Sequence, residues 1–120
     1  MRALVITTKR DVLEREGAIT LSFLNQGVGG YLEAVSLRLV REVGPALVAT
    51  MYVNEEGKLK RLPVNPIGTV LARLAGGLHD TIVGDVVLVG PPDKHGEDTS
   101  LAGEWVELIG SLAQHKEDRE

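Results

Sequence analysis

Five polar residues in the middle of the chain have the types and the spacing of an anion-binding site. They are Asn54, Lys58, Lys60, Arg61 and Asn65. Lysine and arginine attract anions, and an Asn-Pro pair such as Asn65 and Pro66 is typical of a helix start, where unpaired backbone N–H groups favour negative charge. We therefore expect these five residues to bind a phosphate or a carboxylate. Each also has a structural alternative, as a turn former, a helix cap or a charge that keeps a strand soluble.

Other side chains give weaker grounds for chemistry. The histidines His79, His95 and His115 are far apart and show no metal-ligand spacing, so the sequence predicts no metal site and no other cofactor. The chain has no cysteine, which excludes a thiol nucleophile, and it has no G-x-S-x-G motif. Asp85, Glu55 or His79 would be the acid–base groups of an enzyme, but nothing in their spacing favours catalysis over binding.

The predicted site depends on a strand, a tight turn and a helix. Residues 46–53 form an apolar, β-branched run that predicts a strand. Asn54 and Gly57 then predict a hairpin turn, with Gly57 at a positive φ angle. The returning strand, residues 58–62, is expected to turn Lys58 and Lys60 to solvent and Leu59 inward. Asn65 is the expected cap of a helix that ends near Gly76.

The rest of the chain predicts an α+β fold. We expect strands at residues 3–7, 31–40 and 81–89, the second of them interior and antiparallel to 46–53, and a loop or hairpin at 9–17. A short helix starts at Thr20 or Ser22, and a last helix, bearing Trp105, starts at Thr99 or Ser100 after a polar, mobile loop at 91–100. The sheet is mixed and mainly antiparallel, of about four to six strands, with two or three helices packed on one face. Residues 1–113 form one domain, and residues 114–120 form a charged, disordered tail.

Composition limits the classes of function. The 120 residues carry a formal net charge of −4, and aromatic residues make up only 3%. Both features disfavour nucleic acid, which is bound through basic surfaces and stacked aromatic rings. The N-terminal apolar run is too short for a signal peptide, and no segment reaches membrane-spanning length, so we expect a cytoplasmic protein.

Three stretches, in this order, resemble one family. They are residues 28–35 (VGGYLEAV), 52–66 (YVNEEGKLKRLPVNP) and 82–90 (IVGDVVLVG). Together they resemble domain of unknown function family 3846, small proteins of phages, plasmids and actinobacteria, over roughly residues 1–108. The resemblance implies a phage or mobile-element origin and a setting in the host cytoplasm. It implies no particular activity.

We therefore expect a non-enzymatic binding protein that forms a homodimer. It would sequester an anionic small molecule, such as a nucleotide signal of host defence, or bind a host protein. The first alternative is a nucleic-acid-associated accessory or regulatory protein that uses the same basic strand. The second is an enzyme of unknown reaction.

Overall fold

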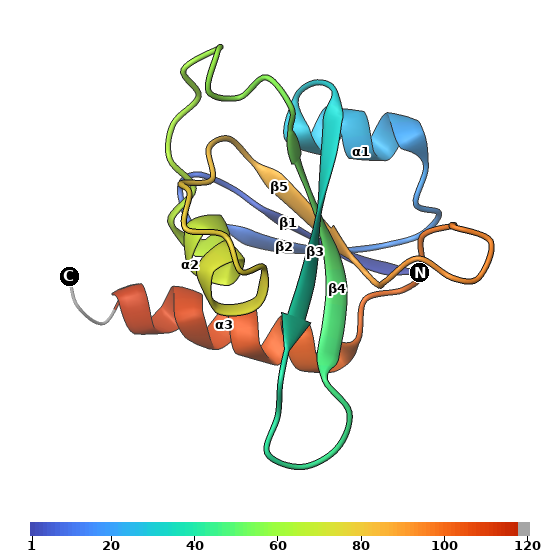
Figure 1. The fold of residues 1–120 in the computed structure, drawn as a ribbon. Helices are drawn as coiled ribbons and strands as arrows, with labels where there is room; N and C mark the ends of the chain where they lie inside the picture. The colour runs from blue at the N-terminus through green and yellow to red at the C-terminus, as the bar shows by residue number, and fades with distance from the viewer. Residues whose placement is uncertain (118–120) are drawn as a thin grey trace.

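A five-stranded antiparallel sheet forms the centre of the molecule (Figure 1). The computed structural model describes residues 1–117, and residues 118–120 lie outside it. In spatial order the strands are β2 (Val12–Glu16), β1 (Arg2–Ile6), β5 (Val86–Val89), β4 (Leu47–Asn54) and β3 (Leu32–Leu39). All four neighbouring pairs are antiparallel. The expected α+β class is confirmed.

Helices cover both faces of this sheet. Helices α2 (Pro66–Ala75) and α3 (Gly103–Glu117) pack on one face, and α1 (Leu21–Val28) packs on the other (Figure 1). The expectation of helices on one face therefore holds for α2 and α3 and is wrong for α1. The physical reason is strand alternation: Val86 and Leu88 face α2 and α3, whereas Val87 and Val89 face α1. Because both faces of β5 are apolar, both must be covered.

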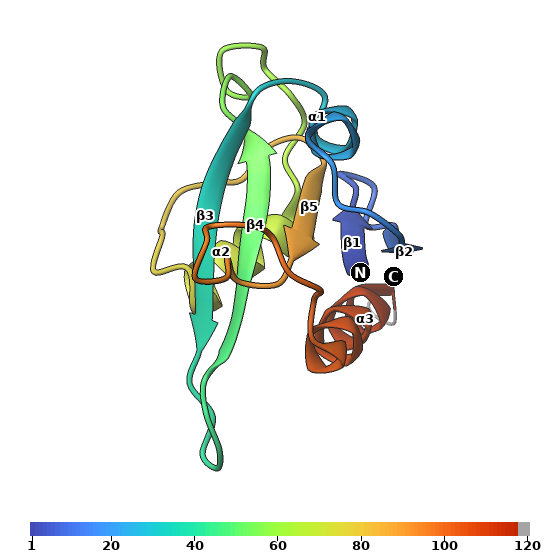
Figure 2. The same cartoon turned by 90° about the vertical axis from the view of Figure 1, so that its right-hand side faces the viewer.

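Strand β3 lies at an edge of the sheet, so its predicted interior position is wrong (Figure 2). Its apolar residues on both faces suggested two strand neighbours. In the structure Val35 and Leu37 pack in the α2–α3 core, and Leu32 packs against the α1 core. Helices rather than a second strand therefore account for the pattern.

The predicted hairpin after β4 is also wrong. Residues 55–61 form consecutive turns in place of a strand, with the Lys60 N–H donating to Glu56 and the Leu62 N–H donating to Gly57. Leu59 is 84% exposed rather than inward. Gly57 has no positive φ angle; a side chain is excluded there because a Cβ would lie 2.8 Å from Val83 Cγ2. The residue of these turns with a left-handed backbone conformation is Arg61, with φ 53°.

The segment after α2 forms less strand than expected. Of the predicted strand 81–89 only β5 forms, and Val83 makes a single antiparallel bridge to Val64. Gly84 has φ 80°, and a Cβ there would lie 2.8 Å from Leu62 Cδ1. A residue with a side chain would therefore be strained at this position, both by the positive φ and by the contact with Leu62.

Both predicted helix caps that precede α1 and α2 are confirmed. Thr20 Oγ1 accepts from the Phe23 N–H at 3.1 Å, and α1 ends at Gly29 with φ 79°. Asn65 caps α2, and Gly76 ends it. In both helices a capping residue expected from the sequence occupies the N-cap position.

Helix α3 begins later than predicted, at Gly103. Ser100 Oγ accepts from the Arg2 N–H at 2.8 Å, and the Leu101 N–H donates to the Arg2 carbonyl at 2.9 Å. These bonds hold residues 100–101 alongside β1, so the helix cannot start at Thr99 or Ser100. The helix continues to Glu117, past the predicted start of the tail at 114; the last part of that tail lies outside the described residues.

None of the helices in the described part of the chain is long and apolar enough to span a membrane.

Candidate functional site

Asn65 is fully buried and all its side-chain polar atoms are used inside the protein. Its Nδ2 donates to the carbonyls of Ile6 and Gly84, each at 3.0 Å, and its Oδ1 accepts from the Gly68 N–H at 2.9 Å. The start of α2 is therefore capped and covered by protein. It is not open to an anion.

Asn54 is also a buried structural residue. Its Nδ2 donates to the Val28 carbonyl at the end of α1, at 3.2 Å, and its Oδ1 accepts from the Glu56 N–H at 2.8 Å. These bonds join α1 to the turns after β4. Neither asparagine of the predicted site offers a free amide to a ligand.

The three basic residues of the predicted site do not converge. Lys58 and Lys60 line two different hollows, and Arg61 lines neither. Lys58 forms an ion pair with Asp80, and these two side chains are 57% and 68% exposed. The pKa of Asp80 lies below its ordinary value, chiefly because Lys58 donates a hydrogen bond to the carboxylate and also because the Thr81 N–H donates to it.

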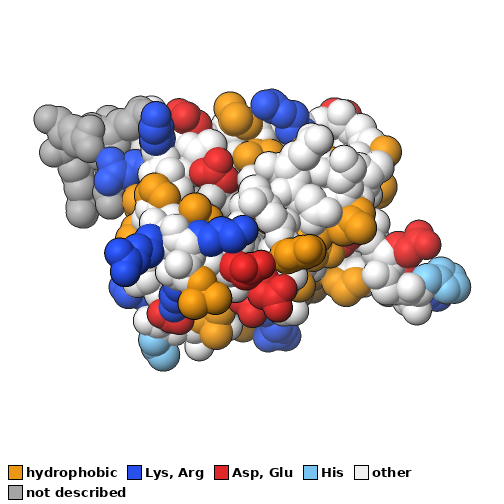
Figure 3. Space-filling model, turned by 90° about the horizontal axis from the view of Figure 1, so that it is seen from above, with side chains coloured by type: hydrophobic (Ala, Val, Ile, Leu, Met, Phe, Trp, Pro, Cys, Tyr) orange, Lys and Arg blue, Asp and Glu red, His pale blue; other side chains and the backbone are white. Residues whose placement is uncertain are grey.

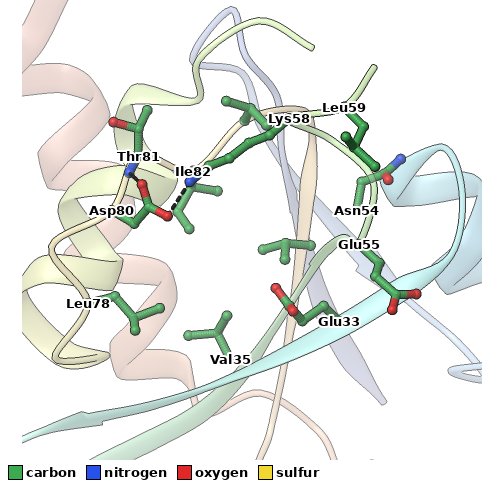
Figure 4. A pocket seen from close by; sticks show the side chains of 12 residues that line it. Glu33, Val35, Asn54, Glu55, Lys58, Leu59, Leu78, Asp80, Thr81 and Ile82 are labelled. Atoms are coloured by element: carbon green, nitrogen blue, oxygen red, sulfur yellow. Dashed lines mark hydrogen bonds and ion pairs between the residues drawn. The ribbon is translucent and has the colours of Figure 1, made fainter. Parts of the chain in front are cut away.

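The main candidate site is a cavity of about 310 Å³ beside Lys58, which we call the Lys58 cavity (Figure 4). Strand β3, the end of β4 with its following turns, and the loop before β5 supply its walls. Its apolar lining is Val35, Val53, Leu59, Leu78, Ile82 and Val83, and its polar lining is Glu33, Asn54, Glu55, Lys58, Asp80 and Thr81. An apolar body with a few polar groups is the usual composition of a small-molecule site.

The charge of the Lys58 cavity is negative. Glu33, Glu55 and Asp80 line it, and the single ammonium, that of Lys58, is already paired with Asp80, so the unpaired carboxylate that faces the space is that of Glu33. Figure 4 shows the Glu33 carboxylate directed toward the space between β3 and the Lys58–Asp80 pair, and the Glu55 carboxylate directed away from it. A cavity with this balance attracts a cation or a hydrogen-bond donor and repels an anion.

Sequence reasoning missed Glu33, Leu78 and Asp80 as members of a site. They lie 20 or more residues from Asn54, in a strand and in a loop that no motif marks. Only the packing of α2 against β3 brings these segments together. Nothing in the sequence around these residues indicates that α2 packs against β3.

Lys60 lines a second hollow, of about 330 Å³, which we call the Lys60 hollow. Thr8, Gln26 and Asp85 contribute polar side chains to it, and Asp85 Oδ1 accepts from the Thr8 N–H at 3.0 Å. Among the residues whose side chains the structure describes, 1–114, Lys60 forms no ion pair. On the upper face of the molecule basic and acidic side chains are interleaved, without a continuous basic patch (Figure 3).

The candidate acid–base residues are dispersed. Glu55 lines the Lys58 cavity, Asp85 lines the Lys60 hollow, and His79 lines neither. The ionisable group whose pKa is most clearly raised is Tyr52, to about 12, first because of burial and then because its hydroxyl donates to Asp98 at 2.6 Å. This bond ties the loop at 91–100 to β4, and Tyr52 belongs to neither hollow.

Fold and site together define a small α+β protein with a five-stranded antiparallel sheet and an acidic-rimmed cavity at one end of β3 and β4. Residues 1–114 match the family described as Domain of unknown function (DUF3846), and the chain belongs to this family. No curated protein and no solved structure matches the chain.

Proposed function

We propose that this protein acts by binding, and that its ligand is a small molecule with an apolar body and an amino group. The observation that carries the proposal is the Lys58 cavity, with its apolar lining and its excess of carboxylates. In this arrangement the ligand's ammonium group lies near Glu33, and its apolar part contacts Val35, Leu78 and Ile82. A volume of about 310 Å³ is at the lower end of the range for such sites.

The charges that line the Lys58 cavity favour an amine over the anionic ligand expected from the sequence. Lys58 would have to leave Asp80 before it could pair with an anion, and the anion would then lie near Glu33. A bound amine does not break the Lys58–Asp80 ion pair and is not repelled by Glu33, which instead gains a partner. Charge-assisted hydrogen bonds of this kind are about twice as strong as neutral ones.

The test compares two probes of the same shape and opposite charge. We expect 2-phenylethylamine to perturb the NMR resonances of the cavity residues, and 3-phenylpropionate to leave them unchanged at equal concentration. Glu33→Gln should weaken amine binding about tenfold, which corresponds to about 1.4 kcal/mol. Glu107→Gln, an equal charge change on an exposed position of α3, should leave binding unchanged. Equal binding of both probes, or an unaffected Glu33→Gln variant, would contradict the proposal.

The anionic ligand remains a second candidate, at the Lys60 hollow. The observation that favours an anion in the Lys60 hollow is that Lys60 forms no ion pair among the described residues. The Thr8 and Gln26 side chains, which line the same hollow, add polar groups beside it. A phage or mobile-element protein in the host cytoplasm could use this hollow to sequester a nucleotide signal.

A thermal-shift screen against linear and cyclic nucleotides at low salt tests this second candidate. A ligand present at about 100 times its dissociation constant adds about 2.7 kcal/mol of stability, which is several degrees for a domain of this size. Lys60→Glu should abolish the shift, whereas Lys94→Glu, in the loop at 91–100, should preserve it. A shift that survives Lys60→Glu would count against the Lys60 hollow.

A further inference from the structure

The open edge of the sheet at β3 has the features of a self-association surface. Strand β3 has eight residues and pairs, within the described chain, only with β4. An edge strand presents unpaired N–H and C=O groups to which another strand can hydrogen-bond. We propose that β3 pairs antiparallel with β3 of a second copy, which joins the two sheets into one.

The direction of the free backbone groups follows from the pairing with β4. The Glu55 N–H donates to the Tyr31 carbonyl at 2.9 Å, and Leu32 lies opposite Asn54 in the same register. In an antiparallel pair, alternate residues exchange hydrogen bonds with the partner strand. The odd-numbered residues of β3 therefore bond to β4. The outward N–H and C=O groups belong to Leu32, Ala34, Ser36 and Arg38.

The side chains along this edge fit a second copy. Ala34 and Ser36, at the centre, are small and exposed, so they do not obstruct an approaching strand. The largest exposed apolar side chains lie at the two ends: Tyr31 is 70% exposed and Val40 is 74% exposed. Antiparallel pairing brings the Tyr31 end of each copy against the Val40 end of the other.

The β3–β4 connection extends this surface. Residues 40–46 project beyond the sheet, as Figure 2 shows, and Val43 in this connection is 86% exposed. An eight-residue strand is only about 27 Å long, and pairing through it alone buries less than a standard interface. The projecting connection of each copy supplies the additional apolar contact.

The opposite edge of the sheet lacks these features. Strand β2 has five residues, and Glu14, Arg15 and Glu16 form its end. Charged side chains of this kind protect an edge strand against pairing. Association is therefore expected at β3 and not at β2, which gives a closed dimer rather than a chain of sheets.

Two-fold symmetry and the outward groups together set the register. Residues whose N–H and C=O groups point away from β4 must lie opposite the same kind of residue in the second copy, because only these groups can form the new hydrogen bonds. The register centred on the strand therefore puts Ser36 opposite Ser36 of the second copy. Ala34 then lies opposite Arg38 of the second copy, with both side chains on the same face of the joined sheet. This contact gives a test that depends on the sign of one charge.

The experiment is sedimentation equilibrium of the full chain over a concentration series. The wild-type mass is expected to rise from 12.9 kDa toward twice that value. Ala34→Lys places a like charge opposite Arg38 and should weaken dimerisation at least tenfold, whereas Ala34→Glu should preserve or strengthen it. Ser36→Pro removes an outward N–H without removing a bond to β4, so it should be monomeric with an unchanged circular dichroism spectrum.

Three outcomes would overturn the inference. A wild-type protein that stays at the monomer mass excludes the dimer, and a Ser36→Pro variant that dimerises like the wild type excludes the β3 edge. Equal weakening by Ala34→Lys and Ala34→Glu excludes the register. None of these measurements requires a ligand in the Lys58 cavity, so the result is independent of the proposed function.

Discussion

Asn65 joins three segments of the molecule through a single side-chain amide. It caps α2 and holds the end of β1 at Ile6 and the start of the β5 segment at Gly84. An aspartate would keep the capping oxygen but would lose both donors and place a carboxylate oxygen against two carbonyls. The two roles of the amide can therefore be separated by substitution.

We expect Asn65→Ala to lower the free energy of unfolding by about 3 kcal/mol, from the lost cap and two unsatisfied buried carbonyls. Asn65→Asp should cost at least as much, although it retains the cap. Thr20→Ala, which removes only the single cap bond of α1, should cost about 1 kcal/mol. Urea unfolding followed by circular dichroism measures all three, and an Asn65→Asp variant as stable as the wild type would refute this account.

At this scale the sequence predicts the role of a residue better than its partner. The Asn65–Pro66 pair correctly predicted a capped helix, because a cap is satisfied by neighbours in the chain. It could not show that the remaining amide donors were used by Ile6 and Gly84. Likewise Lys58 was correctly expected at the surface, but its partner Asp80 is 22 residues away.

Helix α1 packs directly against Val87 of the sheet at Gly27. A Cβ on Gly27 would lie 2.4 Å from Val87 Cγ2 of β5. In α3, Gly110 occupies the interior of a helix, and beyond its own helical turn nothing lies within 4 Å of an added Cβ. The same residue type therefore has opposite consequences in the two helices.

We expect Gly27→Ala to destabilise the protein and Gly110→Ala to stabilise it. Alanine gains about 0.5–1 kcal/mol over glycine in a helix interior, and Gly110→Ala should show this gain in full. At Gly27 the same gain is outweighed by overpacking, which costs about 1–3 kcal/mol. Thermal unfolding measures both effects: we expect the midpoint to fall for Gly27→Ala and to rise for Gly110→Ala. A stabilised Gly27→Ala variant would contradict the close packing of α1 on β5.

The elements themselves were predictable where local chemistry determines them. Apolar runs marked β1, β3, β4 and β5, and caps marked the starts of α1 and α2. The edge position of β3 depends on the order of strands, which no local pattern encodes. The predicted hairpin after β4 did not form because the chain continues in turns through residue 61, closed by hydrogen bonds from Lys60 to Glu56 and from Leu62 to Gly57. Gly57 lies in these turns, and the close approach of Val83 to it involves a neighbour that only the folded chain supplies.

At the scale of the whole molecule, the described residues form two apolar cores that share strands of the sheet. On β1, Leu4 belongs to the α2–α3 core and Ala3 to the α1 core; on β5, Val86 and Val87 are divided in the same way. Strands β1 and β5 are therefore held from both faces. We therefore expect that one core cannot lose its strands while the other keeps them.

This sharing predicts a single cooperative unfolding transition. Val87→Ala removes packing only from the α1 core and should cost about 2 kcal/mol. The single tryptophan, Trp105, lies in the α2–α3 core on the other face. Its fluorescence should nevertheless report the same loss and the same urea midpoint as circular dichroism, because the two cores unfold together. If the Trp105 transition kept its wild-type midpoint while the circular dichroism signal shifted, the α1 core would be an independent unit, and the shared strands would not couple the two faces.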